Sequence, residues 1–320
     1  MTAGVFEAWL LAFVLVTGLA LGCLGLLMIG HLFKESWLHP LRDELEAGAR
    51  TLPLTALLAL PLLLGLSDLY PWARPGFADE PMLPSYRVSY FQQTWVLVRS
   101  AVFFVVWIGL ALWIARPGLH RRASALGLVV LSATVSLAAI DWVGSRQPEW
   151  WSSLFGMAFG VSQLLGALAL VSVVDLARPG MLSPDQTRGL AKALLALALV
   201  ALWLWFSQFL IVWFANLPHE VRWYLVRQDG WSLLNLGIVI PTLILAMALL
   251  TPRHRGQARM MIACGLLLLH HLAYMLWLIR PAAADPAAHW FDPLALVVVG
   301  VLWGSVFVYG LRQQLATAAP

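Results

Sequence analysis

The chain has 320 residues, of which 61% are hydrophobic and only 11% are charged. Soluble domains carry about 25% charged residues, so the composition excludes a soluble protein and indicates an integral membrane protein. The formal net charge of +4 is too small and too dispersed to favour a nucleic-acid-binding surface.

Apolar runs long enough to cross a hydrocarbon core of about 30 Å recur along the whole chain. Such runs satisfy their backbone hydrogen bonds as helices, which in chain order cover residues 5–30, 51–70, 94–115, 123–144, 153–176, 189–216, 231–250, 258–279 and 293–313. We expect an all-α integral membrane protein with about nine transmembrane helices, arranged as two four-helix bundles plus one extra helix. The expected divisions are 1–145 for the first bundle, 146–280 for the second, and 281–320 for the last helix and a short tail.

Three prolines and one connection should modify this pattern. Pro53 and Pro61 in the second helix and Pro241 in the seventh should kink their helices unless neighbouring groups compensate. The 31–50 connection is expected to include a helix at the membrane surface.

Basic residues indicate the orientation. Thirteen Lys and Arg residues lie in the connections 31–50, 116–122, 177–192, 252–259 and the C-terminal segment, against six in the opposite connections. The positive-inside rule therefore predicts an N-terminus outside and a C-terminus in the cytoplasm.

Tryptophan is concentrated toward the predicted outer face, which holds eleven of the seventeen. Trp, Tyr and Arg are favoured as anchors in protein–protein interfaces, so the excess indicates a docking partner outside. The alternative is a chance bias in an interfacial aromatic belt. The candidate docking residues are Trp72, Trp150, Trp151, Asn216, Glu220, Trp223 and Arg227.

Ionisable residues inside apolar runs are costly and are candidates for function. Asp68, Arg99 and Asp141 share an outer depth in the first bundle, so they are expected to meet, either as an ion pair or as a quinone or proton site. Asp175, near the cytoplasmic end of its helix, either admits protons or, more simply, snorkels to water. Glu7, at the outer rim, should be solvated or paired with an arginine.

His270 and His271 lie near the middle of the eighth helix and are followed by Tyr274. They are either hydrogen-bonded core histidines or a step in a proton relay. Adjacent histidines point about 100° apart, so they cannot clamp one haem iron. Gln208 is a further candidate for the proton path or quinone site, with an interhelical hydrogen bond as the simpler interpretation.

The sequence shows no metal-ligand spacing, nucleotide-binding loop or hydrolytic triad, so no metal site and no catalytic residue is predicted. The chain has two cysteines, whereas an iron–sulfur cluster is held by about four thiolates. The chain alone is therefore expected to bind no such cofactor.

Three segments together resemble the ActF-type membrane subunit of bacterial alternative complex III, in the NrfD/PsrC-like superfamily. They are "LPLLLGLSDLYPWA" (60–73), "DWVGSRQPEWWSSLFG" (141–156) and "FSQFLIVWFANLPHEVRWYLVRQDGW" (206–231). Family members usually have ten spans, and the resemblance implies that this chain starts at their second. Asp68, Asp141, Gln208, Asn216 and Glu220 fall within the matching motifs.

The resemblance implies a non-catalytic or quinone-interacting subunit of a quinol-oxidising respiratory complex in the bacterial inner membrane. Its implied partners are a sister NrfD-like membrane subunit, extracytoplasmic iron–sulfur and multihaem cytochrome c subunits, and lipid. In such complexes quinol oxidation is usually assigned to the sister subunit, and the ActF-like copy is a scaffold and a suspected proton path.

Two alternatives stay open. The chain could itself be the quinol-binding anchor, with Asp68, Arg99 and Asp141 at the headgroup. It could also be a secondary transporter, although transporters usually place their polar site at the midplane of broken helices, not at the outer rim.

Overall fold

A computed structural model of the protein describes residues 2–33, 38–77, 83–114, 121–178, 182–251, 256–283, 285–287 and 289–318. These residues form helices and no strand. Within them, nine helical segments are long and apolar enough to cross a membrane, which confirms the predicted all-α membrane fold. The elements are α1 (Thr2–Phe33), α2 (Arg42–Ala49), α3 (Leu52–Ala59), η1 (Leu60–Gly65), α4 (Leu66–Leu69), η2 (Pro71–Ala73), α5 (Ser85–Tyr90), α6 (Gln93–Ile114), α7 (Arg121–Trp142), η4 (Gly144–Arg146), α8 (Phe155–Leu176), α9 (Pro184–Ala215), α10 (Pro218–Leu225), α11 (Gly230–Leu234), η5 (Asn235–Val239), α12 (Ile240–Leu250), α13 (Gln257–Ile279), η6 (Arg280–Ala282) and α14 (Phe291–Ala318).

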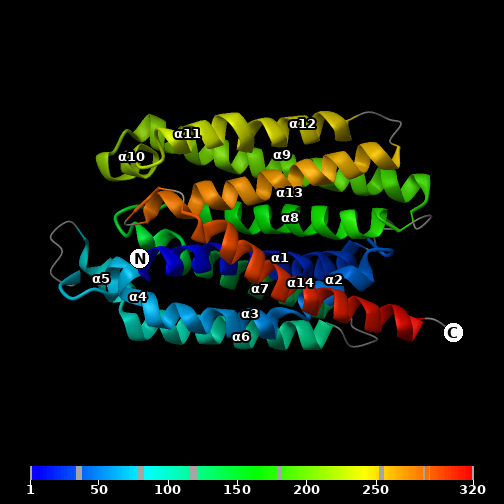
Figure 1. The fold of residues 1–320 in the computed structure, drawn as a ribbon, viewed down its shortest axis with the longest axis horizontal. Coiled ribbons are helices and arrows are strands. Elements are labelled where there is room, and N and C mark those ends of the chain that lie inside the picture. The colour runs from blue at the N-terminus through cyan, green and yellow to red at the C-terminus, as the bar shows by residue number, and fades with distance from the viewer. Residues whose placement is uncertain are drawn as a thin grey trace.

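The long helices pack as two four-membered rings with their axes roughly aligned (Figure 1). In the first ring α1 packs on α3 and α7, and α6 joins these two. In the second, α8 packs on α9 and α13, and α12 closes the ring. The rings meet where α1 packs against α8, and α14 lies against α1 and α2. The chain thus has the predicted two bundles and one extra helix, while division into domains at residues 145 and 280 remains a prediction.

The chain begins at one end of the bundle and finishes at the other (Figure 1). We call the end that holds the start of α1, together with α5 and α10, the amino end, and the opposite end the carboxy end. The connections that carry the resemblance motifs lie at the amino end.

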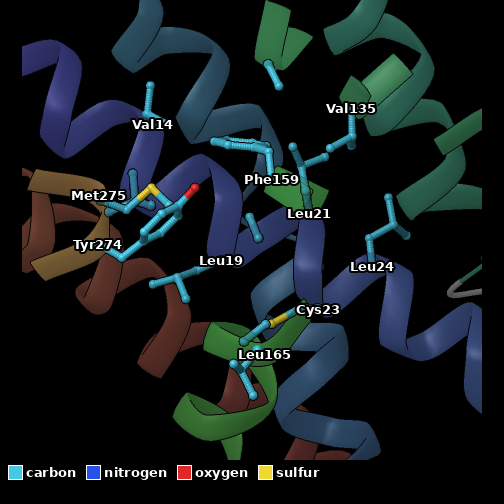
Figure 2. Close-up of a cluster of buried hydrophobic side chains, with 14 of the residues drawn as sticks. Val14, Leu19, Leu21, Cys23, Leu24, Val135, Phe159, Leu165, Tyr274 and Met275 are labelled. Carbon is cyan, nitrogen blue, oxygen red and sulfur yellow. The ribbon is translucent and has the colours of Figure 1, made fainter. Parts of the chain in front are cut away.

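Helix α1 occupies the centre of the molecule, and 94% of its most apolar 18-residue stretch is buried. Figure 2 shows Val14, Leu21 and Leu24 of α1 among neighbouring side chains such as Phe159 of α8. A methyl group added at Gly22 would lie 2.3 Å from the backbone oxygen of Gln163. Glycine is therefore what lets the backbones of α1 and α8 approach so closely.

The three prolines act in different ways. Pro53 stands in the first turn of α3 and starts the helix instead of kinking it. Pro61 lies in η1, where the second span changes from α- to 3₁₀-helix. Pro241 follows the π-helical segment η5, and the Thr242 hydroxyl donates to the Ile238 carbonyl at 2.6 Å. The chain thus accommodates Pro61 and Pro241 where the helix type changes.

Helix α2, in the connection where a helix at the membrane surface was predicted, is covered by other helices, and its position relative to a membrane remains a prediction. Residues 44–49 are buried, and the helix packs against α1 and α14. A methyl group at Gly48 would lie 2.5 Å from the Cys23 sulfur, so α2 touches α1 directly. This position brings the carboxylates of α2 into the protein interior.

Candidate functional site

The two longest resemblance motifs contact each other at the amino end. The Trp150 and Trp223 rings stack with centroids 3.8 Å apart and planes 15° apart. Beside this stack, Arg222 Nη1 donates to Glu149 Oε2 at 2.8 Å. The connection between α7 and α8 is thereby joined to α10, so segments about seventy residues apart form one unit.

Arg227 is the buried centre of this unit. Its guanidinium donates to Gln147 Oε1 at 3.0 Å and to the carbonyl oxygens of Trp223 and Leu278 at 2.6 and 2.8 Å. It also lies 3.5 Å from the centroid of the Trp223 ring, in a cation–π contact. Burial, and to a smaller extent the charge of Arg146, lowers the pKa of Arg227 to about 9. Carbonyl dipoles and an aromatic face hold this cation.

Two buried ion pairs lie next to it. Arg146 Nη2 donates to both carboxylate oxygens of Glu7, at 2.6 and 2.5 Å, and Nη1 donates to the Ile279 carbonyl at 2.6 Å. Arg280 Nε lies 3.2 Å from Asp292 Oδ2. Each of these four charged side chains is at most 5% exposed. Glu7 is therefore paired with an arginine, as one alternative expected, and the pair is buried instead of lying at a solvated rim.

Arg99 and Asp141 meet as predicted. Arg99 donates to both oxygens of the fully buried Asp141, at 2.9 and 3.0 Å, and its Nη2 donates to the Tyr90 carbonyl at 3.1 Å. Burial raises the pKa of Tyr90 to about 12, and the charge of Asp141 adds to this shift. Asp68 is half-buried at the end of α4, and none of the ion pairs formed by the described residues joins it to this unit. The arrangement is that of a satisfied ion pair.

The histidines of α13 face the interior and differ in their bonding. His270 Nδ1 lies 2.8 Å from the Val239 carbonyl, in the π-helical segment before Pro241. His271 packs against Gly166, where an added methyl group would lie 2.8 Å from the imidazole. Its Nε2 has no hydrogen-bond partner among the described residues. His270 therefore helps to stabilise the irregular part of the seventh span, whereas His271 keeps an unused polar group in the core.

Tyr274 and Gln163 extend this polar region between α8 and α13. Tyr274 is buried, packs on Trp205 with centroids 4.8 Å apart, and lies beside Met275 in the core (Figure 2). Gln163 Nε2 lies 3.9 Å from Met275 Sδ. The Tyr274 hydroxyl and Gln163 Oε1 have no partner within the described part of the chain. Gln163 was not among the candidates predicted from the sequence, and the available signal was its amide in the middle of the fifth apolar run.

Gln208 makes the simpler interaction that was expected of it. Its Oε1 accepts a hydrogen bond from the Ser152 hydroxyl at 3.2 Å, and its side chain is buried. The bond joins α9 to the connection before α8. Gln208 thus belongs to the same contact between the two motifs as the tryptophan stack.

The candidate docking residues divide into buried and accessible groups. Trp72, Trp150, Trp223 and Arg227 are buried within the chain, and Glu220 is half-buried. Trp151 is 41% exposed. Asn216 is exposed and has φ 48° and ψ 37°, a left-handed conformation that ends α9 immediately before Leu217 and the first turn of α10. Three of the four tryptophans in this group therefore organise the amino end, and Trp151 is the one that a partner can reach.

A cavity of about 340 Å³ opens within the amino end. Four connections contribute to its wall, with Phe77, Glu149, His219, Arg222 and Pro281 among the lining residues. The cavity is therefore both aromatic and charged, next to the stacked tryptophans.

At the carboxy end, Asp175 differs from its prediction. Its side chain is buried and does not snorkel to water. The reason is the position of α2, which packs beside α8 inside the bundle.

Metal ligands do not gather in the described ranges, where no three His, Cys, Asp or Glu side chains come together. Cys23 and Cys264 are buried free thiols on α1 and α13.

In comparisons with known proteins, no protein-family model and no curated protein matches this chain.

Proposed function

We propose that this chain is a membrane subunit of a quinol-oxidising respiratory electron-transfer complex of the alternative complex III kind. In this proposal it spans the bacterial inner membrane with its amino end outside. It holds extracytoplasmic iron–sulfur and multihaem cytochrome c subunits beside a sister NrfD-like subunit. The redox centres belong to these partners, and this chain offers polar groups for proton movement.

The observation that carries the proposal is the contact between the two resemblance motifs. The Trp150–Trp223 stack and the Glu149–Arg222 ion pair connect segments that the resemblance had identified separately. Because α10 is held in this way, the amino end is a shaped platform with Trp151 and the 340 Å³ cavity on it. A rigid surface loses little conformational entropy on binding and therefore suits a permanent subunit interface.

Purification from native membranes tests this proposal. The tagged chain should co-purify with c-type haem, seen as its visible absorption bands, and with iron–sulfur signals in electron paramagnetic resonance. Trp151→Ala should lower the haem recovered per chain, because it removes an exposed aromatic anchor at the amino end. Trp203→Ala is the matched control, since Trp203 is 62% exposed but lies in the middle of α9.

Two outcomes would count against the proposal. A colourless and stable chain that purifies alone would contradict membership in such a complex. Equal loss of haem in both tryptophan variants would show that the amino end has no special part in docking.

A second candidate function is that the chain itself binds quinol, and one cavity favours it. A groove of about 420 Å³ lies between α1, α7 and α8, with Gly25, Ser132, Gly160 and Gln163 among its lining residues. Its volume lies in the range usual for small-molecule sites, about 300–1,000 Å³. The cavity near Arg99, lined in part by Val96, is only about 70 Å³.

Bound quinone in the purified chain, measured by solvent extraction and chromatography, tests the second candidate. Gly160→Leu should displace quinone from the groove, whereas Gly265→Leu should not, because Gly265 has open space around it. If Asp141→Asn instead abolishes quinol oxidation while assembly stays intact, the headgroup lies at the Arg99–Asp141 pair. Absence of quinone from wild-type protein would remove this candidate.

A further inference from the structure

The carboxy end of α8 holds a buried acid without hydrogen-bond partners. Asp175 is 0% exposed, and neither carboxylate oxygen has a hydrogen-bond partner in the described ranges. The cation closest to it is Arg178, whose Nη2 lies 4.0 Å from Oδ1. An ionised carboxylate in this position would lose its hydration without gaining a hydrogen bond.

Arg178 already has another carboxylate partner. Glu44, on α2, is fully buried and forms an ion pair with Arg178 Nη2. The neighbouring acid of α2, Glu46, pairs instead with Arg42 and Arg50. One guanidinium therefore faces two buried carboxyl groups, Glu44 and Asp175, and can neutralise only one of them.

Helices α9 and α13 also bring polar and charged groups to this end. From α13, Gln257 Nε2 donates to the Leu176 carbonyl at 2.6 Å, and Arg259 stands exposed in the first turn. From α9, Arg188 pairs with Asp185 at an exposed first turn, and Lys192 is exposed. Arg178 provides the one ion pair that Asp175 makes within the described part of the chain.

We infer that Asp175, Glu44 and Arg178 form a proton-binding site at the carboxy end, in which Asp175 is the group that takes up the proton. Two carboxyl groups beside one cation share the charge most favourably when one of them is protonated. A hydronium ion at the carboxy end gives up the proton: one of its O–H bonds breaks as a new O–H bond forms on one Asp175 oxygen, and a water molecule is left. Intramembrane acids of this kind mark proton paths in pumps and transporters.

The site faces toward the polar region of α13 but does not reach it. Ser172 lies one turn from Asp175 on α8, and Cys264 of α13 interacts with it. Buried Leu168 and Leu267 then separate Ser172 from His271. This apolar stretch is about 9 Å long. The length is the helical rise over the six residues of α8 between Ser172 and Gly166, where His271 makes contact. Asp175 is thus a loading site for protons, and passage beyond it requires water to enter this stretch.

Infrared spectroscopy of the purified full chain in detergent tests the inference. A protonated carboxyl group absorbs in a C=O stretching band separate from that of carboxylates, and the band shifts in heavy water. At mildly acidic pH, Asp175→Asn should remove one such band. Glu44→Gln should also remove it, because Arg178 is then free to pair with Asp175. Arg178→Gln should add a second band, since both acids then lack their cation.

Asp185→Asn is the control, because Asp185 is an exposed acid at the same end and its spectrum should match wild type. Size-exclusion chromatography shows which variants fold. The wild-type spectrum provides a measurement without mutation, since raising the pH should abolish the band as Asp175 ionises. An unchanged band in folded Asp175→Asn, or no pH-dependent band in wild type, overturns the inference.

How the complex uses this proton rests on the function proposed above, but the presence of the proton does not. A chain that purifies without haem would contradict the complex and leave the infrared result intact. A missing band would leave co-purification with redox subunits unaffected.

Discussion

The Glu7–Arg146 pair gives the sharpest prediction for stability. Glu7→Gln keeps the shape of the side chain and removes its charge, leaving Arg146 buried without a carboxylate. Arg146 is 0% exposed, and among the described residues it also donates to the Ile279 carbonyl. Removing one partner of a buried pair costs about 3–5 kcal/mol. The unfolding equilibrium should therefore shift by roughly a hundredfold to several thousandfold.

The matched control is the exposed pair at the same end. Arg222 is 62% exposed, so Glu149→Gln should cost at most about 1 kcal/mol. Both variants can be compared by unfolding in mixed micelles with increasing dodecyl sulfate, followed by tryptophan fluorescence. The difference between them comes from burial, since the two substitutions are chemically the same.

A double variant separates pairing from other effects. Glu7→Gln with Arg146→Met removes both charges, so its cost should fall to about 1–3 kcal/mol, mainly for the unsatisfied Ile279 carbonyl. The double variant should be more stable than Glu7→Gln alone. If the two substitutions instead add, or if Glu7→Gln behaves like Glu149→Gln, the pair does not hold the amino end together.

Two further substitutions test the packing of the core. Gly22→Ala should destabilise the protein by about 1–3 kcal/mol, because the new methyl group would lie 2.3 Å from the Gln163 backbone oxygen. Gly265→Ala is the control: no atom lies within 4 Å of its added methyl group, so in the same micelle assay the stability should stay unchanged or rise by up to about 1 kcal/mol. If Gly22→Ala and Gly265→Ala changed the stability equally, the close packing of α1 and α8 would be contradicted. His270→Phe should cost about 0.5–1.5 kcal/mol, because the Val239 carbonyl loses its imidazole partner but still accepts from the Thr242 hydroxyl at 3.2 Å; unchanged stability would show that the imidazole bond is unimportant.

Hydrophobic length and proline position were enough to predict the spans and the break at Pro61. A run of about 20 apolar residues has few alternatives to a membrane helix. The meeting of Arg99 and Asp141 could also be predicted, because both lie inside apolar runs at matching depth and an unpaired charge there is costly. Asp68 was predicted at the same depth, but it does not join the pair. The direction in which its side chain points depends on how the second span bends through α3, η1 and α4.

Burial of Asp175 could not be predicted, because it depends on a distant element. An acid one turn from the end of an apolar run usually reaches water, and local sequence contains nothing to prevent it. Helix α2 covers it after folding between α1 and α14, although its own sequence is typical of a surface helix. The burial of Trp150 and Trp223 has a similar cause, since each tryptophan is covered by a segment remote in the sequence.

The stacked indoles of Trp150 and Trp223 also have an optical consequence. Two indole rings with centroids 3.8 Å apart couple their electronic transitions, and wherever the two transition dipoles are not parallel the coupling adds a signal to the ultraviolet circular dichroism. That signal depends on contact between the α7–α8 connection and α10, and it vanishes when they separate. The protein thus carries an internal spectroscopic marker for the integrity of its amino end, readable without any label.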